Sequence, residues 1–501
     1  ALSESAPYSA ANPLFWAEVY PKGTWYFAAS VYELTGNIEA GKAYTLLVMA
    51  ITFCVYYDCL RMKFGSTLRP IIVSLFAAAN PIAVAQFQSY YVDGLVSCAI
   101  LSVFLLFATM MNREYSGDRG LILLCAVCLI LIGCNVKFSS ALFLGSVTVC
   151  FFVIYMIYFM RGRVDFIKPS KLFLLFAGSA IVAIPVVGWS PYITNTLRYK
   201  SPLYGLIGGD VALLGSDNLE MSGAIRGLNN TQMFFASLFG KMSHGEHRTV
   251  GDLLKVPFTV SWDELGFYNF VDTRLGGMGV LFGGIFLLSC VILLVCGITG
   301  GRKRALAPHN VCLFALVSVT IAEMLILPAS YQARYIGFIC IVPVMALAVV
   351  FCRNAPSDRH GGLRADGSSD HSVARSDRSG ERPGCATGTS GCAGGRFKMA
   401  AAVFLSAAMF LNCMPWGYPA LQRIIESAHT RTALKSMATS GTDQPFEVLF
   451  YLRDFSGLNY NLRDFGVPYV IAEEERPGDD FQSTYFNWIF YRQAVDLGQL
   501  E

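Results

Sequence analysis

Charged side chains beside long apolar runs are the first candidates for chemistry in this sequence, because placing such groups near lipid is costly. Asp93 lies at the end of a short polar turn between two apolar runs, after an Asn80-Pro81 bend. It could act as a general base, or it could only cap the helix that follows. Gln86, Tyr90 and Tyr91 lie in or just before the same turn and are candidates for substrate binding. The bend and the polar run favour a site.

Three further charged residues lie at or inside apolar runs. Lys137 separates two such runs. There it either extends to the membrane surface or holds an anionic group such as a phosphate. Glu323 lies within a later run, and Arg334 begins the next one. Glu323 and Arg334 either form a structural ion pair or contact a substrate, and we expect the two alternatives about equally.

The stretch 189–204 interleaves aromatic and hydrogen-bonding side chains. Its aromatic candidates are Trp189, Tyr192 and Tyr204, and Asn195 is its candidate amide. An aromatic belt at the membrane interface explains part of this pattern. Sugar-binding sites also combine aromatic faces with hydrogen-bonding groups, so both interpretations stay open.

Composition indicates which elements must position these residues. The 501-residue chain is 54% hydrophobic and only 15% charged, and its mean hydropathy is +0.48. Soluble proteins average about 25% charged residues, so the apolar excess indicates lipid as the solvent. The net charge of +3 gives no reason to expect nucleic acid as a partner. Most of the fifteen cysteines lie inside apolar runs, where they are typical of packed core residues rather than a metal site.

About ten apolar runs approach the ~20 residues that a membrane-spanning helix needs. Their approximate ranges are 44–60, 70–86, 95–111, 121–134, 141–160, 172–189, 278–297, 311–328, 335–352 and 398–414. The predicted fold is therefore an all-α polytopic membrane bundle.

The basic residues predict how the bundle is oriented. Lys and Arg follow the first, third, fifth, seventh and ninth runs, and the alternate connections carry few. By the positive-inside rule, the basic side faces the cytoplasm. Residues 1–43, the loop 190–277 and the tail 416–501 are then outside. Amphipathic stretches such as 231–239 predict short helices on the membrane surface within that loop.

The predicted domains follow from this topology. Residues 44–352 form the transmembrane core, and 398–415 form the last span. Between them, 353–397 is rich in Gly, Ser, Arg and Asp and is predicted to be a disordered cytoplasmic linker. The tail after the last span has short strand-like runs and is predicted to form a small α/β module. Because the chain starts at Ala1 with an outer segment before any span, a preceding helix is expected to be missing.

Together these stretches resemble the large bacterial branch of the GT-C glycosyltransferases, which use polyprenyl-phosphate-linked sugars. The resemblance covers roughly residues 10–350 and rests on motifs in the family's order and topological positions. These motifs are Asn80-Pro81, Gln86, Tyr90-Tyr91-Val92-Asp93-Gly94, Val136-Lys137-Phe138-Ser139, Trp189 through Asn195, Ser201-Pro202-Leu203-Tyr204 and Ala333-Arg334-Tyr335. The tail matches no family that we recognise.

The resemblance implies an inverting transfer at the outer membrane face, in which an acceptor hydroxyl displaces polyprenyl phosphate from the sugar. An acid in the first outer loop would serve as the base. Glu4 and Glu18 are the candidate carboxylates in that segment, and Asp93 matches the family's second acidic position. Lys137 and Arg334 would contact the donor phosphate. Because the topology places Asp93, Lys137 and Arg334 at the same membrane level, we expect them to converge on one outward-facing cavity. The family's acid directly after its first span has no counterpart here, so the base stays open.

The implied partners are membrane lipid, a polyprenyl-phosphate sugar donor and a glycan, lipid or protein acceptor, with the protein in the plasma membrane. No cofactor is predicted, and a divalent cation is left open. Two other classes stay open. A transporter or flippase would show internal repeats and interrupted helices, and no convincing repeat is found. A non-catalytic membrane scaffold is the third class.

Overall fold

The computed structural model describes the chain over most of its apolar core and parts of the remainder. The described residues are 19–64, 66–115, 117–204, 225, 227–243, 250–299, 306–326, 330–352, 390–439, 446–450, 462–471, 482–483 and 489–493. Glu4, Glu18 and most of the predicted linker 353–397 lie outside these ranges.

Within the described ranges, each of the ten predicted spans corresponds to a helix or an interrupted pair of helices. They are α3 (Ala43–Phe64), α4 (Leu68–Ala78) with α5 (Pro81–Gln86), α6 (Asp93–Met110), α7 (Arg119–Cys134), α8 (Phe138–Met160), α9 (Pro169–Ile181) with η2 (Val182–Val187), α16 (Phe282–Thr299), α18 (Pro308–Ile326), η5 (Ala333–Cys340) with α19 (Ile341–Phe351), and α20 (Ser390–Cys413). Eight of them are long and apolar enough to cross a membrane, and α4 and α7 are shorter. The chain is a multi-pass membrane protein.

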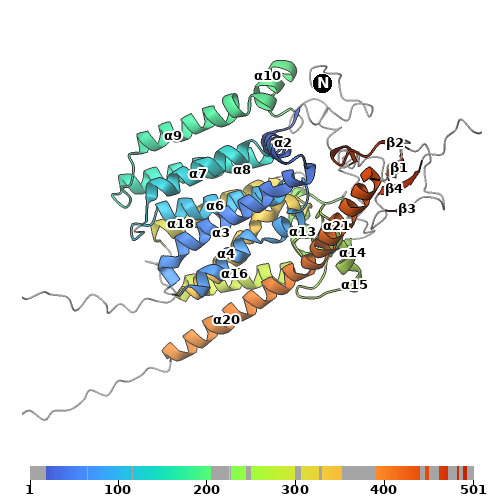
Figure 1. Ribbon diagram of the computed structural model, residues 1–501. Helices are drawn as coiled ribbons and strands as arrows, with labels where there is room; N and C mark the ends of the chain where they lie inside the picture. The colour runs from blue at the N-terminus through green and yellow to red at the C-terminus, as the bar shows by residue number, and fades with distance from the viewer. Residues whose placement is uncertain are drawn as a thin grey trace, which may run out of the picture.

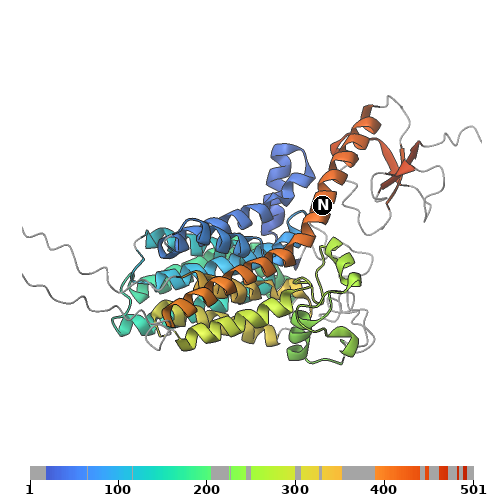
Figure 2. The same cartoon turned by 90° about the horizontal axis from the view of Figure 1, so that it is seen from below.

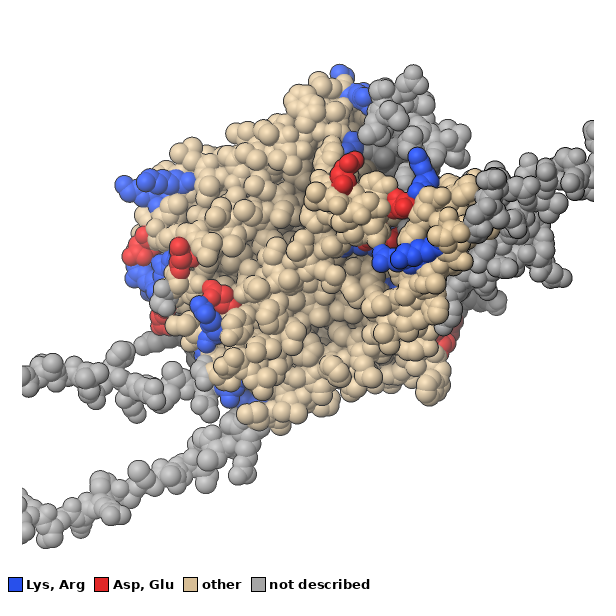
Figure 3. Space-filling model, in the orientation of Figure 1, with Lys and Arg blue, Asp and Glu red and all other residues tan. Residues whose placement is uncertain are grey.

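These helices lie side by side in one bundle (Figure 1). On the face shown in Figure 3, a broad belt without charged side chains separates Lys, Arg, Asp and Glu residues at the two ends. A belt of this kind is expected where lipid tails contact the protein. We call the end that carries Arg61, Arg113 and Arg161 the basic end, and the opposite end the site end.

Helix α6 is the centre of the bundle, and 94% of its residues are buried. It packs against α3, α5, α7, α18 and η5. Gly94 in its first turn allows α5 to approach, because a Cβ at this position would lie 2.6 Å from the Cα of Ala83. This contact fixes the site end of α6, where Asp93 is the first helical residue.

Asn80 and Pro81 explain the interruption between α4 and α5. The side chain of Asn80 accepts a hydrogen bond from the Ala83 backbone N–H, and Pro81 occupies the first turn of α5. Asn and Pro suit these positions because the asparagine oxygen satisfies a free N–H and proline has none to satisfy. Pro185 lies inside η2. The η5–α19 pair has non-helical backbone angles at Ile336.

Short helices cover the site end of the bundle. They are α2 (Gly23–Thr35), η1 (Ile38–Lys42), η3 (Trp189–Ile193), α10 (Thr194–Tyr199), α13 (Asn230–Phe239), α14 (Val250–Leu253), α15 (Trp262–Leu265) and η4 (Gly266–Asn269). The helix predicted over 231–239 is present as α13, which begins with a capping box between Asn229 and Gln232.

The last span is longer than predicted, since α20 begins at Ser390, inside the range expected to be linker, rather than at residue 398. After η6 (Met414–Trp416), α21 (Gly417–Thr439) extends beyond the site end of the bundle (Figure 2). It leads to a sheet with strand order β2-β1-β4-β3, formed by β1 (Phe446–Phe450), β2 (Tyr469–Ile471), β3 (Gln482–Ser483) and β4 (Ile489–Gln493). Two of these strands have only two or three residues. An independent α/β module stays a prediction.

Candidate functional site

Asp93 and Lys137 form an ion pair at the site end of the bundle. Their side chains are only 6% and 14% exposed, respectively. Lys137 directly precedes α8, so the pair joins the site ends of α6 and α8. Asp93 does not cap its helix: Val92 holds the cap position without a side-chain bond, and Gln86 accepts from the Gly94 N–H at 2.9 Å.

Tyr335 connects this ion pair to Arg334. The Lys137 Nζ lies 3.8 Å from the centre of the Tyr335 ring, a distance at which a cation is attracted to the ring face. The guanidinium carbon of Arg334 lies 5.0 Å from the same ring and 5.3 Å from the ring of Tyr91. The structure therefore brings Asp93, Lys137 and Arg334 close together, as predicted, whereas the outward-facing cavity and the roles of the three residues stay predictions.

Arg334 pairs with Asp272, a residue that sequence reasoning missed. An Arg334 terminal nitrogen lies 2.7 Å from Asp272 Oδ1, and the Arg274 Nε donates to Asp272 Oδ2 at 3.0 Å. Gln332 accepts a further bond from the Arg334 Nε at 2.9 Å. Of the two alternatives for Glu323 and Arg334, the ion pair between them is wrong, because Arg334 pairs with Asp272 instead. The Asp272-Thr273-Arg274 triplet just before an apolar run was the signal that could have revealed it.

These five charged residues form two ion-paired groups, Asp93 with Lys137 and Asp272 with Arg334 and Arg274, which the Tyr335 ring connects. We call Asp93, Lys137, Arg334, Asp272 and Arg274 the charge chain. Among the described residues, these three cations and two carboxylates leave one excess positive charge, in a place where most of the side chains are shielded from water. An unbalanced cation is costly there unless an anion joins it. The charge chain is therefore suited to bind a singly charged anion.

The segment 19–23 lies over the charge chain and was also missed. It is tied down at three points: the Asn195 amide donates to the Val19 carbonyl, Lys22 donates to Ser190, and the Gly23 N–H donates to the Asn135 carbonyl. Burial, and next the negative charge of Asp93, raise the pKa of the Tyr20 hydroxyl well above its ordinary value. Tyr20 is therefore a neutral group beside the charges.

The polar turn before α6 divides into supporting and site residues. Gln86 is buried and bonds both the Gly94 N–H and the Val271 carbonyl, so it positions the turn. Tyr91 faces Arg334. Tyr90 is 38% exposed and donates to the Ile38 carbonyl away from the charge chain.

The candidates in stretch 189–204 do not reach the charge chain through any described contact. Tyr192 is buried and donates to the Cys134 carbonyl, while Asn195 is buried and holds Val19. The Tyr204 ring stacks on Tyr199 at 3.9 Å. Trp189 is 54% exposed. Tyr192 and Asn195 are therefore supports for the covering segment rather than contacts to a ligand.

Glu323 lies on α18, where its described hydrogen-bond neighbour is Ser146 of α8 rather than Arg334. One of its carboxylate oxygens is buried without a partner among the described residues. Among those residues, no group of three His, Cys, Asp or Glu side chains could hold a metal ion.

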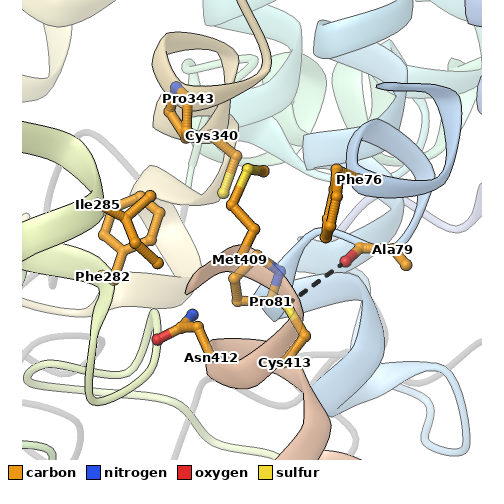
Figure 4. A pocket seen from close by; sticks show the side chains of 10 residues that line it. All are labelled: Phe76, Ala79, Pro81, Phe282, Ile285, Cys340, Pro343, Met409, Asn412 and Cys413. Atoms are coloured by element: carbon orange, nitrogen blue, oxygen red, sulfur yellow. Dashed lines mark hydrogen bonds between the residues drawn. The ribbon is translucent and has the colours of Figure 1, made fainter. Parts of the chain in front are cut away.

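A separate apolar cavity lies beside the interrupted helix α4–α5 (Figure 4). Its walls come from α4, α5, α16, η5, α19 and α20, and include Phe76, Phe282, Met409 and Asn412. The Asn412 amide is already used, because it donates to the Met278 carbonyl and accepts from the Leu281 N–H. This cavity offers packing surface rather than reactive groups.

Fold and site together define a multi-pass membrane protein with a shielded, cation-rich cluster at one end of its bundle. No protein-family model matches the chain, and a search of curated proteins finds no match either.

Proposed function

We propose that this chain is a GT-C-type glycosyltransferase of the plasma membrane. It transfers a sugar from a polyprenyl-phosphate donor to an acceptor hydroxyl on the extracytoplasmic face, with inversion. The observation that carries the proposal is the single excess positive charge of the charge chain. A polyprenyl-phosphate sugar is a phosphodiester with one negative charge, and its tail belongs in the lipid that surrounds the bundle.

In this proposal the donor phosphate competes with the carboxylates for the cations. Its oxygens bind Lys137 and Arg334, which are the only charged members of the chain that contact Tyr335 among the described residues. Once Lys137 turns to the phosphate, the Asp93 carboxylate is free to accept the proton of the acceptor hydroxyl. The same cations stabilise the negative charge that grows on the leaving phosphate. Glu4 and Glu18 stay alternative bases.

Two finer parts of the proposal concern location. The basic residues at one end of the bundle support a cytoplasmic position for that end, which places the charge chain on the extracytoplasmic side. The sheet beyond α21, whose strand β1 packs on Leu434 and Met437 through Phe446 and Val448, supports a small extracytoplasmic α/β module in the tail.

The test uses the purified chain in lipid nanodiscs with synthetic polyprenyl-phosphate sugars, measuring transfer and phosphate-lipid release. Asp93→Asn should abolish transfer and leave donor binding nearly unchanged. Lys137→Ala and Arg334→Ala should each weaken donor binding by about tenfold or more, because each loses a charge-assisted contact. Arg113→Ala, at the basic end, is the matched control. Full transfer activity in Asp93→Asn would contradict the assignment of the base.

A transporter or flippase is the second candidate, because three of the spans are interrupted: α4–α5, α9–η2 and η5–α19. Interrupted helices are typical of substrate sites in transporters. The discriminating experiment places a fluorescent lipid-linked sugar in liposomes that contain the protein. Movement of the intact lipid between leaflets without release of the sugar would favour this candidate over a transferase.

A further inference from the structure

The segment 254–262, which we call the apolar segment, exposes an apolar side chain at every second residue. These side chains belong to Leu254, Val256, Phe258, Val260 and Trp262. Val256 is 70% exposed and Trp262 is 89% exposed. A continuous set of exposed apolar side chains marks a surface that contacts another protein or a membrane. The contacts of the tip and the base of this segment indicate which of the two it is.

The tip of the apolar segment is a tight turn in which Phe258 has an unusual backbone conformation. The Thr259 N–H donates to the Val256 carbonyl at 3.2 Å, and Pro257 precedes Phe258, whose φ is 65°. In a turn with proline second and a positive φ third, the third residue is normally glycine or asparagine, because a larger side chain is strained there. A phenylalanine at this position therefore requires a compensating contact.

That contact is with the sides of two spans. A Cβ on Gly284, in the first turn of α16, would lie 2.4 Å from the Phe258 ring, so the ring rests where only glycine leaves room. The Phe258 ring also meets that of Phe404 on α20 edge to face, with ring centres 6.0 Å apart. Phe404 lies about 13 Å along the helix axis from Cys413, where α20 ends. The tip is therefore folded down along the flank of the bundle rather than over its site end.

The bundle surface around this contact faces lipid. Both α16 and α20 are apolar enough to cross a membrane. Leu287 of α16 and Val403 of α20 are exposed, and Phe404 itself is 56% exposed. Exposed apolar side chains on a spanning helix are expected to contact lipid tails. The apolar segment therefore continues the lipid-facing surface of the bundle.

The base of the apolar segment is fixed by buried polar contacts. Lys255 is the only charged residue of the segment, and it forms an ion pair with Glu264. The two side chains are only 9% and 1% exposed. Glu264 also accepts hydrogen bonds from the Met242 N–H at 2.9 Å and from the Ser261 N–H and hydroxyl at 3.1 and 2.9 Å. The segment is thus held in place at its base and carries no uncompensated charge into its apolar surroundings.

We infer that the apolar segment inserts into the membrane interface beside α16 and α20, and that it anchors this loop in the bilayer. Its irregular backbone stays at the level of the lipid headgroups, because lipid tails cannot hydrogen-bond it. The side chains of Val256, Val260 and Trp262 reach the upper part of the acyl chains. Trp262 suits this position because its indole ring is apolar and carries a polar N–H. The partner is the bilayer itself, so the inference does not depend on the proposed function.

The experiment measures which quencher reaches Trp262. The intact chain is reconstituted in nanodiscs of phosphatidylcholine with or without bromine on the acyl chains. Subtracting the fluorescence of Trp262→Phe from that of the wild type isolates the signal of Trp262 among the six tryptophans. Bromine near the headgroup end of the chains should remove most of this signal, and bromine near the tail end should remove less. Iodide in the water should remove little of it.

Two further reporters, both in the Trp262→Phe background, make the test specific. Val256→Trp moves the reporter next to the tip, and bromine near the headgroup end should quench it as well. Thr432→Trp is the matched control, because Thr432 is exposed on α21, which extends beyond the site end (Figure 2). Its signal should be quenched by iodide and not by bromine.

Two results would overturn the inference. If iodide quenches Trp262 and the reporter of Val256→Trp while bromine quenches neither, the apolar segment lies in water. If neither quencher reaches these two positions, a protein surface covers the segment instead of lipid.

Discussion

Removing the charge of Lys137 tests whether the ion pair is as shielded as its geometry indicates. The Asp93 side chain is 6% exposed and that of Lys137 is 14% exposed, so the pair behaves as a buried one. Breaking a buried pair by removing one partner costs about 3–5 kcal/mol, because the other charge is left without compensation. We expect Lys137→Met to lower the free energy of unfolding by about 3 kcal/mol, toward the lower limit, because Lys137 is the more exposed partner.

The double variant makes this reasoning specific. In Asp93→Asn/Lys137→Met both charges of the pair are removed, so neither leaves the other without its partner, and most of the lost stability should return. The surface pair Arg113–Asp165, with side chains 53% and 71% exposed, provides the control: Arg113→Met should cost less than about 1 kcal/mol.

The assay is unfolding in detergent followed with a thiol-reactive dye, since Cys59, Cys98 and Cys340 are buried until the bundle opens. If Lys137→Met proves as stable as Arg113→Met, the argument that the Asp93–Lys137 pair is buried is refuted. A double variant whose loss equals the sum of the single losses would refute the coupling between the two charges.

Three further predictions concern packing, titration and topology. Gly94→Ala should destabilise the bundle by about 1–3 kcal/mol in the same assay, because its Cβ would meet Ala83. The control Gly145→Ala should leave stability unchanged, because no atom lies within 4 Å of its Cβ. Burial, with Glu39 nearby, raises the pKa of Tyr90 to about 12. The neutral hydroxyl of Tyr90 therefore stabilises the fold below pH 10, and this stability is lost as the pH rises toward 12. The stability of Tyr90→Phe should be less sensitive to that rise in pH. Its absorbance titration should also lack one late tyrosine ionisation. A cysteine introduced by Ser368→Cys should not react with an impermeant reagent in intact cells; reaction would reverse the orientation.

The spans could be predicted because hydropathy is a local property. Lipid cannot hydrogen-bond the backbone, so each crossing segment must be an apolar helix of nearly fixed length. That constraint acts on consecutive residues, and all ten predicted spans correspond to helices or interrupted helices. The start of α20 was misplaced by eight residues because the sequence before residue 398 is polar and small, which hydropathy does not recognise as helical.

The site could be predicted only in part. The predicted topology alone indicated that Asp93, Lys137 and Arg334 lie close together, because connections on one side of a membrane must lie at one level. Topology cannot say which neighbours meet within that level. It left an ion pair between Glu323 and Arg334 as one of two alternatives, whereas the segment after η4 places Asp272 beside Arg334.

The sequence by itself determined that this protein crosses the membrane many times and that a few costly charges lie at the ends of its spans. Only the tertiary structure decided that Asp272 and Tyr335 link those charges and that Tyr20 lies beside them. The physical reason is that solvent preference is encoded residue by residue. The pairing of buried polar groups instead depends on which loops fold back over which helix ends, and the local sequence does not specify that.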